Sequence, residues 1–246
     1  AFDRANLECL IFILVLASVV LKMRGRQILS AICLGVAGAI KVYPLLFLLG
    51  DLVKGNWRRV TWASTFCVLA TLLGLALIPD GYSGALAYLP KNLARFNQEV
   101  VLTWRGMHFN SSLVGALKLP SIYFGSLLGA DLDKIYLFFG ELGKWIAIFG
   151  LIVMLVLGFR LRRAPDWKLA YLACAAILLL PPVSADYKLL HLFIPLLLFV
   201  REAPTLQDKK IATLFGLLLV PKAFVYLVSD ASLTTILNPA LLVLGV

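Results

Sequence analysis

Polar side chains that stand inside or at the edges of long apolar blocks are the residues whose chemistry needs explaining in this chain. Lys41 lies in the sequence Ala-Ile-Lys-Val-Tyr-Pro, residues 39–44. A lysine at the centre of a membrane helix costs on the order of 2.5–3.5 kcal/mol. Lys41 therefore either snorkels or pairs with a carbonyl group that Pro44 frees, or it is a cation that holds a phosphate in a cavity.

A second polar stretch, residues 181–188, reads Pro-Pro-Val-Ser-Ala-Asp-Tyr-Lys and separates two apolar blocks. Ser184 or Asp186 can cap the helix that follows. Tyr187 and His191 are four residues apart, so they share a helix face. The positive potential of a helix N-terminus makes this a natural site for an anion. An ordinary capped hairpin with interfacial aromatic residues is the alternative interpretation.

A third polar stretch, Asn-Ser-Ser at residues 110–112, fits an N-glycosylation sequon and equally the capped start of a helix. The sequence contains no Walker loop, Rossmann glycine pattern, HExxH or GxSxG. Its four cysteines each lie inside an apolar block and form no C-x-x-C pair, so they are interpreted as small buried hydrophobes. We therefore expect no metal site and no cofactor.

The composition indicates the elements that must position these residues. Of the 246 residues, 61% are hydrophobic and 15% are charged, and the mean hydropathy is +0.94. A soluble domain is about half apolar and about a quarter charged. The net charge of +10 could suggest nucleic acid. Because the positive residues collect in short gaps between apolar blocks, they instead mark cytoplasmic loops and contacts with anionic headgroups.

Eight apolar blocks predict the helices. They cover about residues 7–21, 28–50, 60–78, 135–159, 169–180, 187–200 and 211–228, with a last one from 236. Each full block can hold a helix of about 17–25 residues, except the shorter fifth and sixth. The sequence thus predicts an all-α, polytopic transmembrane helix bundle that forms a single domain over residues 1–246.

Basic loops predict the orientation of this bundle. The loops near Arg58, Arg160 and Arg201 are separated by pairs of blocks, so all three should face the cytoplasm. The loop at Arg24 is also basic but lies only one block from Arg58. Residues 28–50 are therefore either a plain span with one loop that breaks the rule, or a hairpin broken near Lys41 that enters and leaves on one side.

The stretch 79–134 should face outward and carry a short helix at the membrane surface. Leu93, Phe96 and Val100 recur at helical spacing, with charged residues on the other faces. Tyrosine and tryptophan residues of this stretch suit the depth of lipid headgroups. We therefore expect an amphipathic helix that lies in the interface.

Four short stretches, in the same order and at similar spacing, match the motifs of one enzyme family. Residues 3–8, Asp-Arg-Ala-Asn-Leu-Glu, are similar to an E-R-G-N-x-E/D helix opening, and residues 39–44 to A-x-K-x-Y-P. Residues 109–115 are similar to x-N-x-S-L-x-G, and residues 180–187 to L-S-P-[IV]-S-W-D-H. In these stretches the chain resembles the bacterial family-87 glycosyltransferases, also called the DUF2029 family.

This resemblance implies a GT-C fold, in which a helical membrane bundle carries its active site on the outer face of the bacterial plasma membrane. Such enzymes take a sugar, often mannose, from a polyprenyl-phosphate carrier. They pass it to a glycolipid or a growing glycan, usually with inversion of the anomeric centre. The implied partners are a polyprenyl-phosphate sugar donor, a glycolipid or glycan acceptor, and membrane lipids, with no nucleic acid.

The resemblance also implies roles for individual residues. A lipid phosphate is already an acidic leaving group and needs cations more than a general acid, and the candidates to hold it are Arg4, Lys41 and Lys188. The acceptor hydroxyl needs a base, and the catalytic candidates are Asp186 and His191. Binding of the sugar or acceptor is expected of Asn6, Tyr43, Asn110, Ser111 and Tyr187.

The chain departs from the family pattern in two of these stretches. Ala5 stands where the family usually has glycine, and Tyr187 and Lys188 stand where many members have His-His or His-Tyr. A role that the family gives to the histidine at the position of Tyr187 cannot be assigned to Tyr187, although His191 could partly take that role. The base of GT-C enzymes is typically an aspartate in the first outward loop. We expect a fragment in which that loop precedes residue 1.

Other functions fit part of this pattern. A secondary transporter or lipid flippase for an anionic amphiphile would also use an intramembrane lysine, broken helices and a basic cavity. The sequence shows no internal repeat, and its long outward stretch suits a lipid-facing enzyme better. A glycan polymerase or ligase that uses the same carriers, and a non-catalytic scaffold subunit, are further alternatives.

Overall fold

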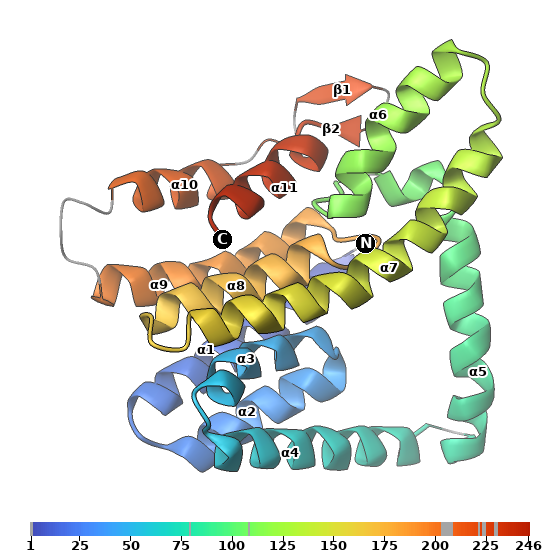
Figure 1. Cartoon of the computed structure of the whole chain (residues 1–246). Helices are drawn as coiled ribbons and strands as arrows, with labels where there is room; N and C mark the ends of the chain where they lie inside the picture. Colours follow the sequence, from blue (N-terminus) through green and yellow to red (C-terminus); the bar gives the residue numbers. More distant parts are fainter. Residues whose placement is uncertain are drawn as a thin grey trace.

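The chain folds into an all-α bundle with a single two-stranded ladder among the parts described (Figure 1). For residues 2–6, 227 and 228 only the backbone is described. The computed structural model covers residues 2–78, 80–107, 109–202, 209–220, 222, 225–228 and 231–246.

The N-terminal half is a layer of helices in which α2 is central. Helix α1 (Phe2–Met23) packs against α2 (Gln27–Ile40), and α2 packs along α4 (Trp57–Ala76). The approach of α2 to α4 is close because Gly35 has no side chain. A Cβ atom at Gly35 would lie 2.6 Å from the carbonyl oxygen of Ala63.

The segment 28–50 is a broken hairpin, as one of the two sequence interpretations predicts. After α2 the chain turns at Lys41 and returns as the 3-10 helix η1 (Tyr43–Leu48) and the short helix α3 (Leu49–Val53). The two arms match in length, at about 20 Å each from the rise per residue of the two helix types. Both basic loops that flank the segment therefore lie at the same end of the bundle.

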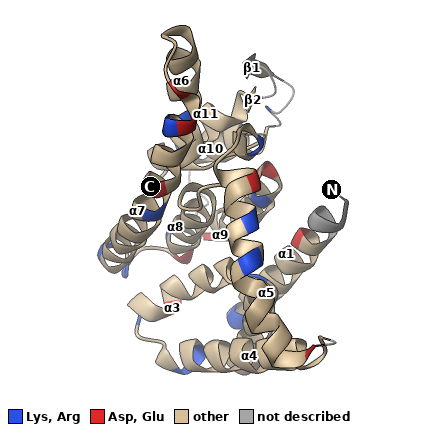
Figure 2. Cartoon of the chain, turned by 90° about the vertical axis from the view of Figure 1, so that its right-hand side faces the viewer, with Lys and Arg blue, Asp and Glu red and all other residues tan. Residues whose placement is uncertain are grey.

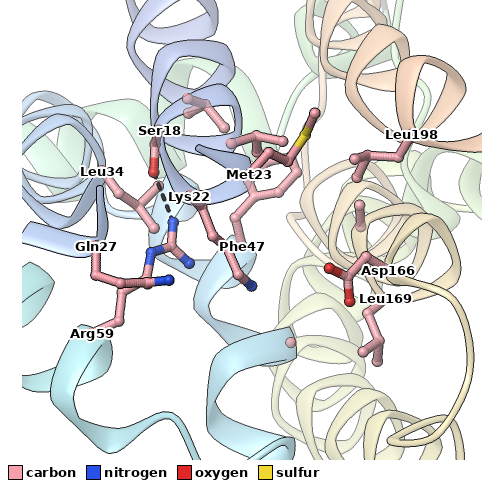
Figure 3. Close-up of a pocket in the computed structure, with 14 residues that line it drawn as sticks. Ser18, Lys22, Met23, Gln27, Leu34, Phe47, Arg59, Asp166, Leu169 and Leu198 are labelled. Carbon is pink, nitrogen blue, oxygen red and sulfur yellow. Dashed lines mark hydrogen bonds between the residues drawn. The ribbon is translucent and has the colours of Figure 1, made fainter. Parts of the chain in front are cut away.

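A buried polar cluster closes that end of the hairpin. The Arg59 side chain is only 3% exposed and forms an ion pair with Asp51. Its Nε donates to Ser30 Oγ at 2.9 Å, and its Nη2 donates to Ser18 Oγ at 2.8 Å (Figure 3). Lys22 Nζ lies 2.9 Å from the other carboxylate oxygen of Asp51. The start of α2, the end of α3 and the end of α1 are thereby tied together.

The stretch 79–134, which the sequence predicts to face outward, contains the predicted helix and several shorter ones. Helix α5 (Gly81–Phe96) runs roughly perpendicular to α4 and buries none of its side chains (Figure 1). The π-helical turn η2 (Asn97–Val101), the 3-10 turn η3 (Trp104–Met107) and helix α6 (Leu113–Leu127) follow it. That α5 lies in the membrane interface stays a prediction.

The C-terminal half is built around a buried central helix. The long helix α7 (Leu132–Arg160) leads to α8 (Asp166–Leu179), in which every residue from Leu169 onward is buried. The 3-10 helix η4 (Asp186–Leu192) and helix α9 (Phe193–Glu202) then run back beside α8 (Figure 1). The break after α8 falls at Pro181-Pro182, where the sequence predicts it.

The seventh apolar block is only partly helical, which corrects the prediction of one helix over 211–228. Helix α10 (Lys209–Leu219) stops before Pro221, a residue that cannot continue the backbone ladder. The strands β1 (Tyr226–Val228) and β2 (Ala231–Ser232) pair antiparallel, and α11 (Thr234–Leu244) returns to the bundle.

Two of the described helices are long and apolar enough to cross a membrane, α4 and α7. Only 11% and 17% of the residues in their apolar windows are buried. Residues 60–76 of α4 and 145–159 of α7 contain no charged side chain, and Figure 2 shows long tan stretches on both helices. An apolar surface that the protein leaves uncovered on long helices is expected where lipid is the solvent, and it indicates a membrane protein.

The orientation can be tested by labelling. In a variant without the four native cysteines, Ser83→Cys on α5 should react with a membrane-impermeant maleimide added to intact cells. Arg162→Cys, in the basic loop after α7, should react only after lysis, because basic loops stay cytoplasmic. The side chains at positions 83 and 162 are both exposed on the protein surface, so a difference in labelling would reflect the side of the membrane and not burial in the fold. The reverse labelling would contradict the assigned orientation.

Candidate functional site

A cavity of about 650 Å³ lies where the hairpin turn, η2, η3 and the start of η4 come together. Its lining contains three cations and three aromatic rings, from Lys41, Arg105, Lys188, Tyr43, Phe96 and Tyr187. No carboxylate is among its described lining residues. The volume lies within the range of about 300–1,000 Å³ typical of ligand sites, and the lining suits an anionic head group.

Glu8, a buried carboxylate of α1, fixes one wall of this cavity. Its side chain is 1% exposed. Glu8 Oε2 accepts a hydrogen bond from Lys41 Nζ at 2.6 Å, and Oε1 accepts one from the Tyr43 hydroxyl. A carboxylate in an apolar bundle needs such partners because its desolvation is costly. Lys41 is thus neither a snorkelling residue nor bound to a freed carbonyl; it is paired with Glu8 and 28% exposed to the cavity.

The local sequence explains why Lys41 and Tyr43 can both reach Glu8. Lys41 is the residue after α2 and has extended backbone angles, with φ −146° and ψ 139°. Pro44 stands in the first turn of η1, where its missing N–H is tolerated but where it cannot continue α2. The helix therefore opens at this point, and the side chains at 41 and 43 point to the same carboxylate.

Lys188 enters the cavity from η4 and faces the same aromatic rings. Its Nζ lies 5.2 Å from the centre of the Tyr43 ring, and Lys41 Nζ lies 5.7 Å from the centre of the Tyr187 ring. Both distances are within the range of cation–π contacts. Among the described residues Lys188 has no carboxylate partner, so its charge is available to a bound anion.

His191 lies behind this wall and does not line the cavity. Its side chain is fully buried, and its ring packs edge-to-face on Tyr43 at 5.5 Å and on Phe12 at 6.1 Å. Its Nδ1 is 3.1 Å from the carbonyl oxygen of Lys188, while its Nε2 has no described partner. His191 therefore contacts Tyr43, which lines the cavity, but does not reach the cavity itself. Its predicted catalytic role stays a prediction.

Asn110 and Ser111 belong to a polar network that anchors the start of η4. Asn110 Oδ1 accepts from the backbone N–H of Ser184 at 2.9 Å and of Ser112 at 3.0 Å. The backbone N–H of Ser111 donates to Ser184 O at 2.7 Å. Ser112 caps α6 by accepting from Gly115 N at 2.9 Å, as the alternative interpretation of this stretch predicts. The Asn110 side chain is therefore occupied by protein groups in this structure.

Asp186 lies at the junction of that network with η4. Its Oδ1 accepts from the Ser111 hydroxyl at 2.5 Å. Burial raises the pKa of this carboxyl group, and the hydroxyls of Ser111 and Thr234 and the charge of Lys222 oppose the rise. Asp186 Oδ2 makes no hydrogen bond among the described residues. One carboxylate oxygen is therefore held while the other is free.

The comparisons with known proteins decide the family. The model of glycosyltransferase family 87 matches residues 1–182, about three quarters of the chain. The chain belongs to glycosyltransferase family 87. It is therefore a transferase enzyme, and the resemblance found in its short motifs is confirmed. No curated protein and no solved structure matches this glycosyltransferase.

The structure brings four of the ten residues predicted for the site of this glycosyltransferase into one cavity. Lys41, Tyr43, Tyr187 and Lys188 line one cavity, although 143 residues (from 44 to 186) separate the two pairs in sequence. The side chains of Arg4 and Asn6 lie outside the described part of the structure.

Two further residues of the site were not predicted, Glu8 and Arg105. Glu8 is an acidic residue at the edge of an apolar block, which is the same signal that identifies Lys41. Arg105 lines the cavity from η3, and nothing in its local sequence distinguishes it from other exposed basic residues.

Glu8→Gln should destabilise the fold, because it removes the negative charge that Lys41 and Tyr43 share. The loss of a hydrogen bond to a charged group costs about 2 kcal/mol of unfolding free energy. Glu99→Gln is the matched control, since the pair of Glu99 with Arg95 is exposed to solvent and should contribute little to stability. Thermal unfolding in detergent measures both. Equal melting temperatures for the two variants would contradict the role of Glu8.

Proposed function

We propose that this glycosyltransferase moves a hexose, with mannose as the first candidate, from a polyprenyl-phosphate sugar to a hydroxyl group of a glycolipid or glycan. We place the reaction on the extracytoplasmic face of a bacterial plasma membrane, in a GT-C-type bundle. The observation that supports this donor is the cavity with three cations, aromatic rings and no described carboxylate in its lining.

The chemistry of the transfer explains why this cavity needs cations. The acceptor oxygen forms a bond to the anomeric carbon while the bond from that carbon to the phosphate oxygen breaks. The electron pair of the broken bond stays on the lipid phosphate, which leaves as an anion. Lys41, Lys188 and Arg105 line the place where this charge would develop, and Arg4 is a further candidate.

The apolar part of the same lining suits the lipid chain of the donor. Leu7 on α1 and Phe96 and Val100 on the outward stretch border the cavity beside the cations. Helix α5, which leads into this border, exposes large apolar side chains. A polyprenyl chain could therefore leave the cavity toward lipid without contact with the bundle core.

The acceptor hydroxyl must lose a proton as it attacks, and Asp186 and His191 remain the candidates for the base. Neither residue lines the basic cavity: His191 is separated from it by Tyr43, whereas Asp186 lines a neighbouring cavity across Tyr187 and has one carboxylate oxygen without a described partner. We favour Asp186 for this reason. Asn6, Tyr43, Asn110, Ser111 and Tyr187 stay the candidates for binding the sugar or the acceptor, with Tyr43 and Tyr187 in the cavity lining.

One observation favours a transporter or lipid flippase as the second candidate. A cavity of about 190 Å³ lies at the other end of α1, lined by Lys22, Arg59 and Asp166 (Figure 3). Phe47 lines this cavity and its ring centre is 6.4 Å from that of His191, so an aromatic layer separates the two cavities. Cavities on both sides of a central layer are typical of alternating access.

Lys41→Ala should lower transfer by about 100-fold or more, because it removes a cation from the leaving phosphate. Membranes that contain the full protein are assayed for transfer of labelled mannose from polyprenyl-phosphate mannose into lipid. Lys144→Ala is the control, since Lys144 pairs with Glu141 on an exposed surface. Normal turnover by the folded Lys41→Ala protein would exclude the role in donor binding. No transfer by the wild type, with measurable flux in liposomes, would favour the transporter.

Asp186→Asn should lower the turnover number by about 100-fold, the usual effect of losing a general base, while the donor KM stays within about twofold. Asp131→Asn is the matched control, because Asp131 caps α7 from an exposed position and asparagine caps equally well. Single-turnover kinetics with labelled donor separate binding from chemistry. Full activity of Asp186→Asn would leave His191 or another group as the base.

A further inference from the structure

A second cavity of about 360 Å³ lies on the other side of Tyr187 from the basic one. Its polar lining residues are Asp186, Tyr187, Lys222, Thr234 and Asn238, and Tyr187 lines both cavities. Ala185 and Lys188, which flank this pair in sequence, line the basic cavity. The start of η4 is therefore a partition with a different cavity on each side.

Two residues that line this second cavity each have a buried side-chain oxygen atom without a hydrogen-bond partner among the described residues. These atoms are Asp186 Oδ2 and Asn238 Oδ1, and the side chain of Asn238 is fully buried. Leaving a buried polar group unpaired is costly. Two such atoms on lining residues of one cavity indicate that a bound molecule completes them.

The network next to these atoms fixes both of them as acceptors. The single proton of the Ser111 hydroxyl goes to Asp186 Oδ1, because a carboxylate can only accept. Ser111 Oγ must then accept from Asn238, which therefore presents its Nδ2 group to Ser111 at 3.0 Å. The amide orientation follows, and Asn238 Oδ1 is left facing away from Ser111. The missing partners are hydrogen-bond donors.

The neighbouring cation and hydroxyl do not supply these donors. Lys222 Nζ is bonded to backbone carbonyls at the end of α10, including Val220 O at 2.9 Å. The Thr234 hydroxyl pairs with Ser232 Oγ, with either oxygen as the donor, and its proximity to Asp186 opposes the rise in the pKa of that carboxyl group without completing a hydrogen bond to Oδ2. The charge of Lys222 at the same cavity also disfavours a metal ion, which would need more than these two oxygen ligands. A neutral molecule with several hydroxyl groups fits best.

We propose that this second cavity is the acceptor subsite and binds a neutral sugar ring of the acceptor. Two of its hydroxyl groups donate to Asp186 Oδ2 and Asn238 Oδ1, and the ring packs against Tyr187. This inference rests on the proposed function and extends it, because it separates an anion-binding side of η4 from a hydroxyl-binding side. Asp186 Oδ2 can take the proton of the hydroxyl bound to it, and for transfer that hydroxyl must meet the anomeric carbon of the donor beside Tyr187, where the two cavities adjoin.

Two variants test the subsite by different routes. Asn238→Leu removes the free acceptor, and Val220→Trp fills the cavity from its rim without touching the hydrogen-bond network. Each should raise the acceptor KM by about tenfold or more, Asn238→Leu because one hydrogen bond to the acceptor is lost and Val220→Trp because the indole occupies the space of the sugar ring, with the donor KM within about twofold. Val243→Trp is the control, since Val243 is 55% exposed, Val220 is 56% exposed, and only Val220 lines the cavity. If Asn238→Leu fails to fold, the acceptor KM of Val220→Trp alone tests the subsite.

A binding measurement keeps this test independent of activity. Saturation-transfer NMR on the full protein in nanodiscs is recorded with methyl mannopyranoside and methyl glucopyranoside as probes. The wild type and Val243→Trp should bind one of them, and Val220→Trp should not. If the wild type binds the glycoside but shows no transferase activity, and Val220→Trp abolishes that binding, the proposed donor is overturned while the subsite is supported. Transfer with an unchanged acceptor KM in both variants, or glycoside binding that survives in Val220→Trp, would overturn the subsite.

Discussion

A charge buried in an apolar bundle needs a partner, and this constraint sets the path of the N-terminal half. Glu8 near one end of α1 holds Lys41 and Tyr43 at the turn of the hairpin. At the other end Lys22 and Arg59 hold Asp51. Residues 8 and 22 are about 21 Å apart along the helix. The two clusters thus hold both arms of the hairpin against α1. The cavity forms at the Glu8 cluster, where helix α2 ends.

The site depends on two helices that stop at the same level of the bundle. Helix α2 ends at Ile40 and α8 ends at Leu179, and each continues as a 3-10 helix after a break associated with proline. The edge-to-face contact between Tyr43 and His191 joins the two 3-10 helices. A continuous helix would direct residues 41 and 43 to different faces. The breaks allow the cations of both halves to line one cavity.

The sequence predicts the features that depend on local physics. The positions of the prolines and the lengths of the apolar blocks predict the helix breaks near Lys41 and at residues 181–182. The two basic loops on either side of residues 28–50 predict a hairpin there as one of two interpretations. The β-strands after Pro221 are missed, because an apolar run of this length is compatible with either a helix or a strand. Asn110 shows a different limit: its polar atoms are used by backbone groups of residues 182–184, and no local pattern shows which distant groups a side chain will meet.

Tyr187 shows how a departure from the family pattern can be consistent with the same chemistry. The motif that residues 180–187 resemble has His-His or His-Tyr where this chain has Tyr187 and Lys188. A tyrosine lacks the ring nitrogen with which histidine accepts a proton, so under the proposed function proton transfer falls to another group. In exchange the ring of Tyr187 lines both cavities, and Lys188 adds a cation to the basic one. Asp186, with one oxygen held by Ser111 and the other free, is placed beside this partition. Under the proposed function, anion binding falls to one side of η4 and hydroxyl binding to the other, and the reacting atoms would have to meet at Tyr187, the residue that lines both cavities.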